Sequence, residues 1–328
     1  MPDLRRMRRV VVCDVGGTHA RFAIASLDDG RVADLSEPVT LRTGEHASFE
    51  AAREEFGRRQ GEALPPQLGI AFAGPVDGNV LKLTNSAWTI RPSQLAAQLG
   101  IERLTIVNDF GAVGHAVAQL GEASFRHLCG PERPLPAEGV ISIVGPGTGL
   151  GVGQLVRRGG GYLVVETEGG HSDFAPLDSV EDGILAHLRG RYGRVSVERI
   201  ASGPGLPSIH EALAALDGET IPERSERELW RAAMAGDDRL ASAALERFFL
   251  SLGAIAGDIA LTQGAAGVVI AGGLGLRLAD HFAGSGFRER FVAKGRFVGR
   301  MEAIPVKLIT YPEPGLFGAA AAFAERYR

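Results

Sequence analysis

The stretch Val10–Ser26, VVVCDVGGTHARFAIAS, has the pattern of an apolar strand, a Gly-Gly-Thr turn and a second strand. A second stretch, Val140–Val156, VISIVGPGTGLGVGQLV, repeats this order with a Gly-x-Gly-Thr-Gly turn. Glycines in a tight turn expose backbone N–H groups, and a concave group of such donors binds anions. Two turns of this kind, each between strands, predict two domains that face one polyphosphate across a cleft.

The bulk composition is that of a globular protein. The 328 residues are 45% hydrophobic and 23% charged, and the length favours two domains. A net charge of −4 and a pI of about 6.1 argue against a nucleic-acid partner, which needs a basic face. Two cysteines are too few for a disulfide scaffold or a CxxC metal site.

The sequence also predicts the compartment. Asp14 interrupts the first apolar run almost at once, so no secretory signal is expected. No segment approaches about twenty uninterrupted apolar residues, so no membrane span is expected. We therefore expect a cytoplasmic protein without a membrane partner.

Strands and helices alternate along the chain, which indicates an α/β fold. Strands are predicted at Val10–Val15, Ala20–Ser26, Val32–Leu41, Leu68–Ala73, Leu104–Val107, Val140–Val144, Val152–Val156, Tyr162–Val165, Gly267–Ala271 and Ile304–Thr310. Helices are predicted at His46–Arg59, Pro92–Leu99, Gly111–Gln119, Ser179–Arg189, Asp237–Gln263 and Gly315–Arg326. Glu122–Gly139 contains three prolines and is expected to be a loop.

The domain boundaries follow from this pattern. We expect the last helix to pack back on the first lobe, which makes the first domain discontinuous. The small domain is then 1–109 plus 311–328, and the large domain is 110–310.

The two glycine turns carry the first candidate site. Asp14 precedes Gly16-Gly17-Thr18, and a carboxylate beside a phosphate-binding turn can hold the hydration shell of Mg²⁺ against the anion. Alternatively, this is an ordinary hairpin turn in which Asp14 bonds nearby backbone. Gly147-Thr148 forms the matching turn of the second half. The chain contains neither GxxxxGK[ST] nor GxGxxG, so a P-loop and a dinucleotide fingerprint are both excluded.

A third glycine site is Gly272-Gly273, which ends an apolar strand. A flat ring or a ribose can approach backbone closely at such a pair, which favours a nucleoside contact. Close packing of a helix on a strand explains the same glycines.

Polar residues follow the strand Leu104–Val107. Asn108 and Asp109 emerge at its carboxyl end, where the ligand crevices of α/β proteins lie. Asp109 can accept the proton of an attacking hydroxyl in phosphoryl transfer, or it can cap the following helix.

The loop Glu166–His171 and Glu198 supply further acceptors. Carboxylates and an imidazole around one site suit a polyhydroxylated ligand, because each carboxylate accepts from two adjacent hydroxyls. A solvated acidic loop is the alternative for 166–171, and a surface charge is the alternative for Glu198.

Together these segments resemble the bacterial glucokinase family of the actin-like sugar kinases, from Val10 to about Phe323. The resemblance is carried by segments that occur in the family's order. They are DVGGTHARFAIA, GIAFAGPVDG, TNSAW, IVNDFGAV, GPGTGLGVG, EGGHSDFAP, ERIASGPGL, IAGGLG and PGLFGAAA. It implies two ribonuclease-H-like lobes with a cleft between them, closing on ATP and glucose, in a homodimer.

The resemblance also implies residue roles. Asp109 matches the catalytic base toward the 6-hydroxyl of glucose. The hexose-binding positions are Asn108, Asp109, Glu168, His171 and Glu198, with Asn85 beside the sugar pocket. The ATP-binding positions are Cys13, Asp14, Val15, Gly16, Gly17, Thr18, Gly147, Thr148, Gly272 and Gly273. Asp14 would lie near Mg²⁺.

Three positions depart from the family pattern. Cys13 and Thr167 stand where glycine is frequent, and His19 stands where asparagine is frequent. None of these departures removes a proposed catalytic group. Two other functions stay open from the residues alone: a kinase for another hexose or amino-sugar, and a non-catalytic sugar-sensing protein.

Overall fold

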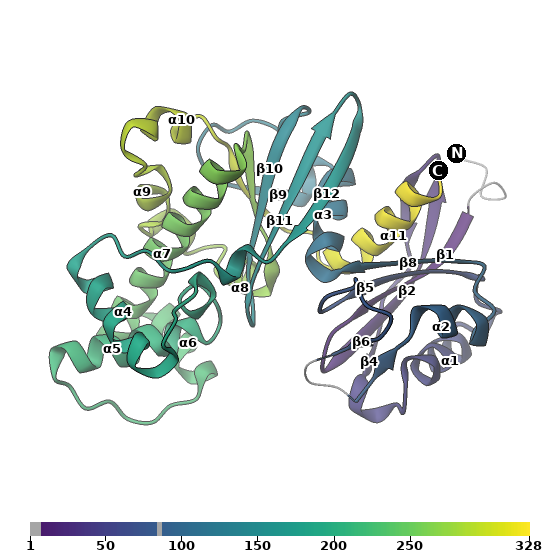
Figure 1. The fold of residues 1–328 in the computed structure, drawn as a ribbon, viewed down its shortest axis with the longest axis horizontal. Helices are drawn as coiled ribbons and strands as arrows, with labels where there is room; N and C mark the ends of the chain where they lie inside the picture. The colour runs from purple at the N-terminus through teal and green to yellow at the C-terminus, as the bar shows by residue number, and fades with distance from the viewer. Residues whose placement is uncertain (1–7, 84–86) are drawn as a thin grey trace. The chain divides into compact units, whose positions relative to one another are not determined.

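The computed structural model describes residues 8–83 and 87–328. It divides into two compact units (Figure 1). Unit 1 comprises the chain up to Gly121 together with Tyr311–Arg328, and unit 2 comprises Glu122–Thr310. The fold is α/β, as the sequence predicts.

Unit 1 contains a six-stranded mixed sheet. Its strands are β1 Arg8–Val15, β2 His19–Asp28, β3 Arg31–Leu35, β4 Val39–Arg42, β5 Gln67–Phe72 and β8 Arg103–Asn108. The order is β3-β2-β1-β5-β8, with β4 also paired to β2. The β1–β2 pair is antiparallel, whereas β1, β5 and β8 are parallel. A short hairpin of β6 Leu81–Lys82 and β7 Thr89–Ile90 lies outside this sheet.

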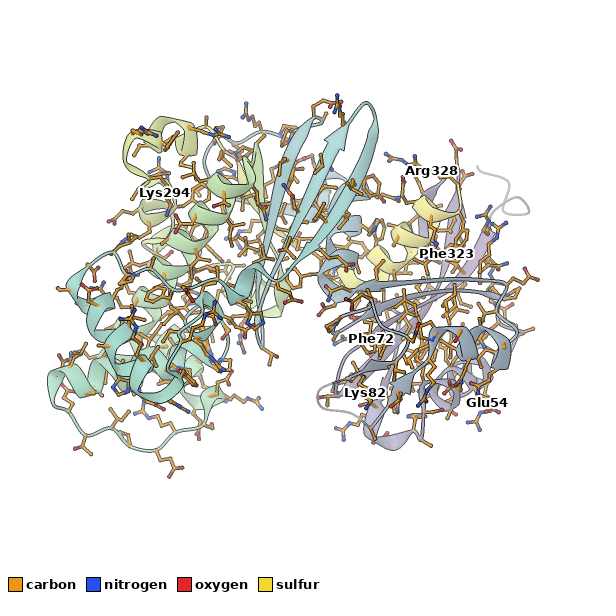
Figure 2. All side chains as sticks on the ribbon, viewed as in Figure 1. Glu54, Phe72, Lys82, Lys294, Phe323 and Arg328 are labelled. Carbon is orange, nitrogen blue, oxygen red and sulfur yellow. The ribbon has the colours of Figure 1, made fainter. Side chains whose placement is uncertain are left out.

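Alternation along β1 gives the sheet two apolar faces. Val10 and Val12 face a core with α11 (Pro314–Arg326), whereas Val11 and Cys13 face a core with α1 (Phe49–Gln60) and α2 (Pro92–Gln98). Figure 1 shows α11 on one side of the sheet and α1 and α2 on the other. The side chains of Phe323 and Phe72, labelled in Figure 2, belong to these two cores.

The helix α3 (Asp109–Gln119) belongs to unit 1, because it packs on α11 at a distance that only small residues permit. A Cβ added at Gly318 of α11 would collide with the carbonyl oxygen of Ala112 in α3. The first crossing between units therefore lies at Gly121/Glu122, twelve residues beyond the expected boundary after Asp109. The second crossing lies at Thr310/Tyr311.

Unit 2 repeats the arrangement of unit 1. Its six-stranded sheet has the order β12-β11-β10-β13-β14-β9. The strands are β9 Phe125–Cys129, β10 Gly139–Pro146, β11 Leu150–Arg158, β12 Gly161–Thr167, β13 Gly267–Ile270 and β14 Val306–Ile309. An antiparallel meander of β12, β11 and β10 is followed by the parallel strands β13 and β14, as β3, β2 and β1 are followed by β5 and β8.

The helices of unit 2 enclose one large core that includes Phe248, Phe249 and Trp230. They are α4 Ser179–Tyr192, α5 Gly205–Asp217, α6 Glu226–Ala235, α7 Arg239–Gln263, α8 Gly272–Arg277, α9 Phe287–Val292 and α10 Val298–Glu302. The central helix, α7, begins where Asp238 accepts from the N–H of Ala241 and ends at Gly264 in the left-handed conformation.

By length and composition, α7 is apolar enough to cross a membrane, with a mean hydropathy of 1.3 over its most apolar window. However, 72% of that window is buried within the protein. This burial is typical of the core helix of a globular domain, so the helix is weak support for a membrane span.

Most predicted elements are confirmed to within a few residues, but two predictions are wrong. The predicted strand Val32–Leu41 is two strands, β3 and β4, which both pair with β2. The predicted loop Glu122–Gly139 contains β9, which pairs antiparallel with β14 at the edge of the sheet. The prolines that suggested a loop follow this strand and do not interrupt it.

Candidate active site

The first glycine turn joins β1 to β2 in unit 1. The Gly16 N–H donates to the carbonyl of His19 at 2.9 Å and closes the turn. The buried Thr43 holds the turn through two hydrogen bonds. Its hydroxyl donates to the carbonyl of Gly17 at 2.7 Å, and its backbone N–H donates to the carbonyl of Thr18. No described residue accepts from the N–H groups of Gly17 and Thr18. The turn therefore leaves two adjacent backbone donors for an anion.

The second glycine turn joins β10 to β11 in unit 2 and is closed by a tighter hydrogen bond. The Gly147 N–H donates to the carbonyl of Gly149 at 2.8 Å. Among the described residues, none accepts from the N–H of Thr148 or Gly149. Thr18 and Thr148 are the exposed residues of their turns. The two turns that the sequence predicted as anion sites thus each leave two adjacent backbone N–H groups without an acceptor among the described residues, although they are closed by different hydrogen bonds.

Asp14 lies beside the first turn, on the face of β1 that packs on α11. A Cβ added at Gly315, in the first turn of α11, would lie 2.9 Å from the Asp14 carboxylate. Arg21 approaches both Asp14 and Glu313, with N–O distances of 3.6 Å to each. The pKa of Asp14 is raised to about 6, chiefly by burial; Arg21 opposes this shift, and the charges of Asp109 and Glu313 contribute to it.

Asp14 is a carboxylate beside the first turn that could hold the water shell of Mg²⁺. Mg²⁺ keeps several waters and is usually held by one or two carboxylates together with substrate phosphates. The described residues contain no cluster of three or more acidic, histidine or cysteine side chains suited to hold a metal. A single carboxylate beside an anion-binding turn fits an ion that is held mainly by water and phosphates.

Asn108 and Asp109 lie where β8 ends and α3 begins. Asn108 caps α3, because its Oδ1 accepts from the N–H groups of Phe110 and Gly111 at 2.8 and 3.4 Å. Its Nδ2 also donates to the carbonyl of Gly74 at 3.1 Å. The capping role that the sequence left open for Asp109 thus belongs to its neighbour.

Asp109 is fixed by the same helix start. Its Oδ1 accepts from the N–H of Phe110 at 2.9 Å. Across the parallel strands, Val15 pairs with Phe72, and Phe72 pairs with Asn108. Asp14 and Asp109 therefore both lie at the carboxyl ends of these strands, on strands that are two strand spacings, about 10 Å, apart. The effect of Asp109 on the pKa of Asp14 agrees with this placement.

In unit 2, the predicted sugar-binding loop follows β12. Gly169–His171 forms a single 3₁₀ turn, η3, and Glu168 and His171 stay 75% and 59% exposed. Their Oε2 and Nε2 atoms are 3.9 Å apart. The loop is anchored through its backbone, since Gly170 packs on the carbonyl of Leu150 and Arg194 donates to the carbonyl of His171. Two polar side chains are thereby held by a fixed backbone and remain accessible to a ligand.

Glu198, in the 3₁₀ turn η4 (Val197–Arg199), lies beside the second glycine turn. Its Oε2 accepts from the N–H of Leu150 at 3.0 Å. The structure therefore brings Glu198, the loop at Gly170 and the turn Gly147–Gly149 together around one residue, Leu150.

The pair Gly272-Gly273 begins α8 next to the end of β10. Gly272 has φ +80°, and a Cβ there would lie 2.6 Å from the carbonyl oxygen of Pro146. Nothing lies within 4 Å of a Cβ added at Gly273. Close packing thus explains Gly272, whereas the open space at Gly273 is compatible with the predicted nucleoside contact.

Two of the predicted ATP-binding residues, Cys13 and Val15, lie in the core next to the first turn. Cys13 and Val15 are fully buried in the core of unit 1, on the face opposite Asp14. Burial and the neighbouring Asp14 also raise the pKa of the Cys13 thiol well above its ordinary value. Their side chains are therefore closed to a ligand in this structure. Asn85, which the sequence placed beside the sugar pocket, lies outside the described residues.

Sequence reasoning missed Arg21, Glu313 and Gly315 around Asp14. The only available signal was their position inside DVGGTHARFAIA and beside PGLFGAAA, two segments that carry the family resemblance.

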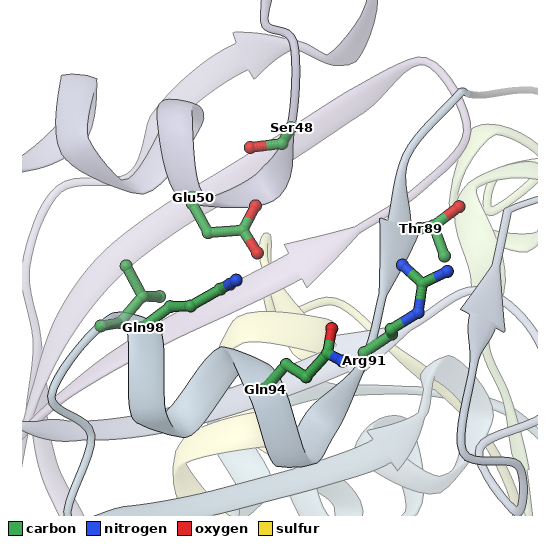
Figure 3. A pocket seen from close by; sticks show the side chains of 7 residues that line it. Ser48, Glu50, Thr89, Arg91, Gln94 and Gln98 are labelled. Carbon is green, nitrogen blue, oxygen red and sulfur yellow. The ribbon is translucent and has the colours of Figure 1, made fainter.

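A separate cavity of about 510 Å³ lies in unit 1 beside α1 and α2 (Figure 3). Its lining side chains are polar with one exception: Ser48, Glu50, Thr89, Arg91, Gln94, Gln98 and Leu99. None of the predicted site residues that the structure describes lines this cavity.

The chain is similar to known glucokinases over nearly its whole length. The family model described as Glucokinase matches residues 11–326. A glucokinase of Zymomonas mobilis is 58% identical over 97% of this chain and 98% of its own length, and one of Caulobacter vibrioides is 42% identical over 97% and 96%. The crystal structure of a glucokinase from an Antarctic psychrotroph superposes with a TM-score of 0.86 at 30% identity, covering 95% of this chain and 98% of the other. The chain therefore belongs to the glucokinase family.

Proposed function

We propose that this chain transfers the γ-phosphoryl group of ATP to the 6-hydroxyl of glucose, with Asp109 as the general base. Glucose kinase activity follows from membership of the glucokinase family over nearly the whole chain. The single observation that supports the ATP site is the pair of glycine turns, each with two backbone N–H groups that no described residue accepts from. Such donors suit the phosphates of a nucleotide.

In the proposed reaction, the Asp109 carboxylate takes the proton of the sugar hydroxyl as its oxygen bonds to the γ-phosphorus. The bond between that phosphorus and the β,γ-bridging oxygen breaks, and ADP leaves. Asp109 suits this role because one carboxylate oxygen is held by the N–H of Phe110. A base fixed in this way keeps its orientation toward the acceptor.

The remaining residues hold the substrates. Asn108, Glu168, His171 and Glu198 would bind the sugar hydroxyls, and Asn85 would lie beside them. The turns at Gly16–Thr18 and Gly147-Thr148 would bind the phosphates, and Gly273 would lie against the nucleoside. When bound, Mg²⁺ neutralises charge on the phosphates, and Asp14 would hold its water shell.

The proposal includes the finer architecture. We expect two ribonuclease-H-like lobes of the actin-like ATPase type with a cleft that closes on sugar and nucleotide. The repeat of a meander followed by two parallel strands in both units supports it. Closure on sugar would also protect ATP from water. A cytoplasmic homodimer completes the proposal, and light scattering after gel filtration tests the dimer.

Asp109→Asn tests the catalytic assignment. Asparagine keeps an acceptor for the Phe110 N–H, so the fold and glucose binding should be retained. Loss of a general base lowers kcat by roughly 10²–10⁴-fold. Glucose 6-phosphate and ADP formation measure kcat, calorimetry measures glucose binding, and Asp28→Asn at the exposed end of β2 is the control. Wild-type kcat in a folded, glucose-binding Asp109→Asn protein would remove Asp109 from the mechanism. A panel of glucose, mannose, fructose and N-acetylglucosamine then tests the substrate.

A further inference from the structure

The segment Glu198–Gly203 braces the second glycine turn at both ends. At one end, Glu198 Oε2 accepts from the N–H of Leu150 at 3.0 Å. At the other, the Gly203 N–H donates to the carbonyl of Gly147 at 2.7 Å, and the indole of the buried Trp230 donates to the carbonyl of Gly203 at 3.0 Å. The turn is therefore held in place by the segment that carries a proposed sugar ligand.

The Glu198 carboxylate packs directly on Gly149 of the turn, so the space that a side chain at this position would need is already filled. A Cβ added at Gly149 would collide with Glu198 Oε2 and lie 3.2 Å from its Cδ. The φ of Gly149 lies outside the left-handed region, so alanine is not strained there by its backbone. Alanine at this position would displace the flexible end of Glu198 and leave the backbone in place.

The loop Glu166–His171, which carries the other proposed sugar-binding residues, also contacts Leu150. Gly170 packs on the carbonyl oxygen of Leu150, and Gly169 packs on the side chain of Val152. Leu150 itself is 4% exposed and belongs to the core of unit 2. Both proposed sugar-binding elements thus contact the first residue of β11, immediately after the phosphate turn.

We infer that Glu198 and Gly149 couple the sugar subsite to the second phosphate turn, so that glucose and nucleotide bind cooperatively through Leu150. This rests on the proposed function. A sugar hydroxyl that donates to Glu198 fixes the carboxylate, which holds the N–H of Leu150 and so orders the turn that binds phosphate. By linkage, nucleotide on the turn strengthens glucose binding by the same factor. Gly149 is a positioning residue in this scheme, because its missing side chain is the space that the Glu198 carboxylate occupies.

Gly149→Ala is compared with Gly190→Ala, a glycine-to-alanine change in α4 of the same unit and outside the proposed site. Nothing lies within 4 Å of a Cβ added at Gly190, so this control should leave Glu198 and the turn in place. The dissociation constant of glucose is measured by calorimetry with the full chain, in the absence and presence of a non-hydrolysable ATP analogue with Mg²⁺. The ratio of the two constants is the coupling factor.

We expect wild type to bind glucose at least fivefold more tightly with the analogue bound, within the usual range of coupling between sites. Gly149→Ala should weaken glucose binding without nucleotide by about tenfold, the scale of a lost hydrogen bond to a charged group. It should also lower the coupling factor threefold or more, whereas Gly190→Ala should keep both the wild-type glucose binding and the wild-type coupling factor. The circular-dichroism spectrum and melting temperature check that both variants fold.

The inference is overturned if Gly149→Ala changes the coupling factor by less than threefold, or if both variants weaken glucose binding equally. Either result would leave the proposed function intact, because wild type would still bind and phosphorylate glucose. Failure of wild type to bind glucose at all would instead overturn the proposed function.

Discussion

Replacing Asp14 by Asn should make the chain more stable at neutral pH while abolishing most of its kinase activity. Asp14 is largely buried, and burial together with two neighbouring carboxylates raises its pKa from 3.8 to about 6. The folded chain therefore holds this proton more tightly than the unfolded chain does. Asparagine keeps the shape of the side chain and removes the buried charge.

The pH dependence follows from the sign of this shift. Well below pH 3.8 the carboxyl group is protonated in both states and contributes no difference. As pH rises from about 4 to 6, the unfolded chain releases the proton first, so the folded state loses stability through this window. Above pH 6 the full loss in the free energy of unfolding is present. The shift from 3.8 to about 6, at about 1.4 kcal/mol for each pKa unit, amounts to about 3 kcal/mol.

Urea unfolding at pH 4 and pH 8 measures the effect. We expect wild type and Asp14→Asn to unfold with similar free energies at pH 4, and the variant to be more stable by up to about 3 kcal/mol at pH 8. Asp28→Asn, at the exposed end of β2, should show no such difference between the two pH values. An equal gap between wild type and Asp14→Asn at both pH values would refute the argument. It would mean that the carboxylate is as well solvated in the fold as in the unfolded chain.

Two other predictions concern the cores. Gly318→Ala should destabilise unit 1 by about 3 kcal/mol, because its Cβ would collide with the carbonyl of Ala112, whereas Gly190→Ala, at an open position in α4, should be neutral or stabilising by less than about 1 kcal/mol in the same urea titration. If Gly318→Ala lowered the free energy of unfolding by much less than this, α3 and α11 would be able to move apart to accommodate the methyl group. The thiols of Cys13 and Cys129 are buried and burial raises the pKa of both, so a thiol reagent at pH 8 should label neither in the native chain and both in denaturant; labelling of native Cys13 would contradict its position in the core.

Much of the fold was accessible from the sequence because local patterns carry it. The two hairpins combine apolar runs with glycine turns, and the structure places both as predicted. The edge strand β9 was missed because its pairing with β14 joins segments about 180 residues apart, whereas its flanking prolines suggest a loop. The assignment of α3 to unit 1 depends on its contact with Gly318, which no local pattern contains.

The sequence proposes site residues but not the contacts around them. The roles proposed for Asp14 and Asp109 rest on their positions at strand ends, whereas Arg21 links Asp14 to Glu313, and Gly315 packs on Asp14 from the other end of the chain. The burial of Cys13 was within reach of the sequence. Alternation along β1 places it on the face opposite Asp14, so the two cannot both face a ligand.

The return of the chain into unit 1 has a consequence for how the protein is made. Val10, Val12 and Phe323 share one core, so β1 lacks part of its core until α11, which follows the whole of unit 2 in the chain, has been synthesised. Unit 2 is one continuous segment, Glu122–Thr310, so its core needs no residue from a later part of the chain. During translation, the second half of the molecule can therefore mature before the first, and the early strands must stay unaggregated until α11 arrives to cover them.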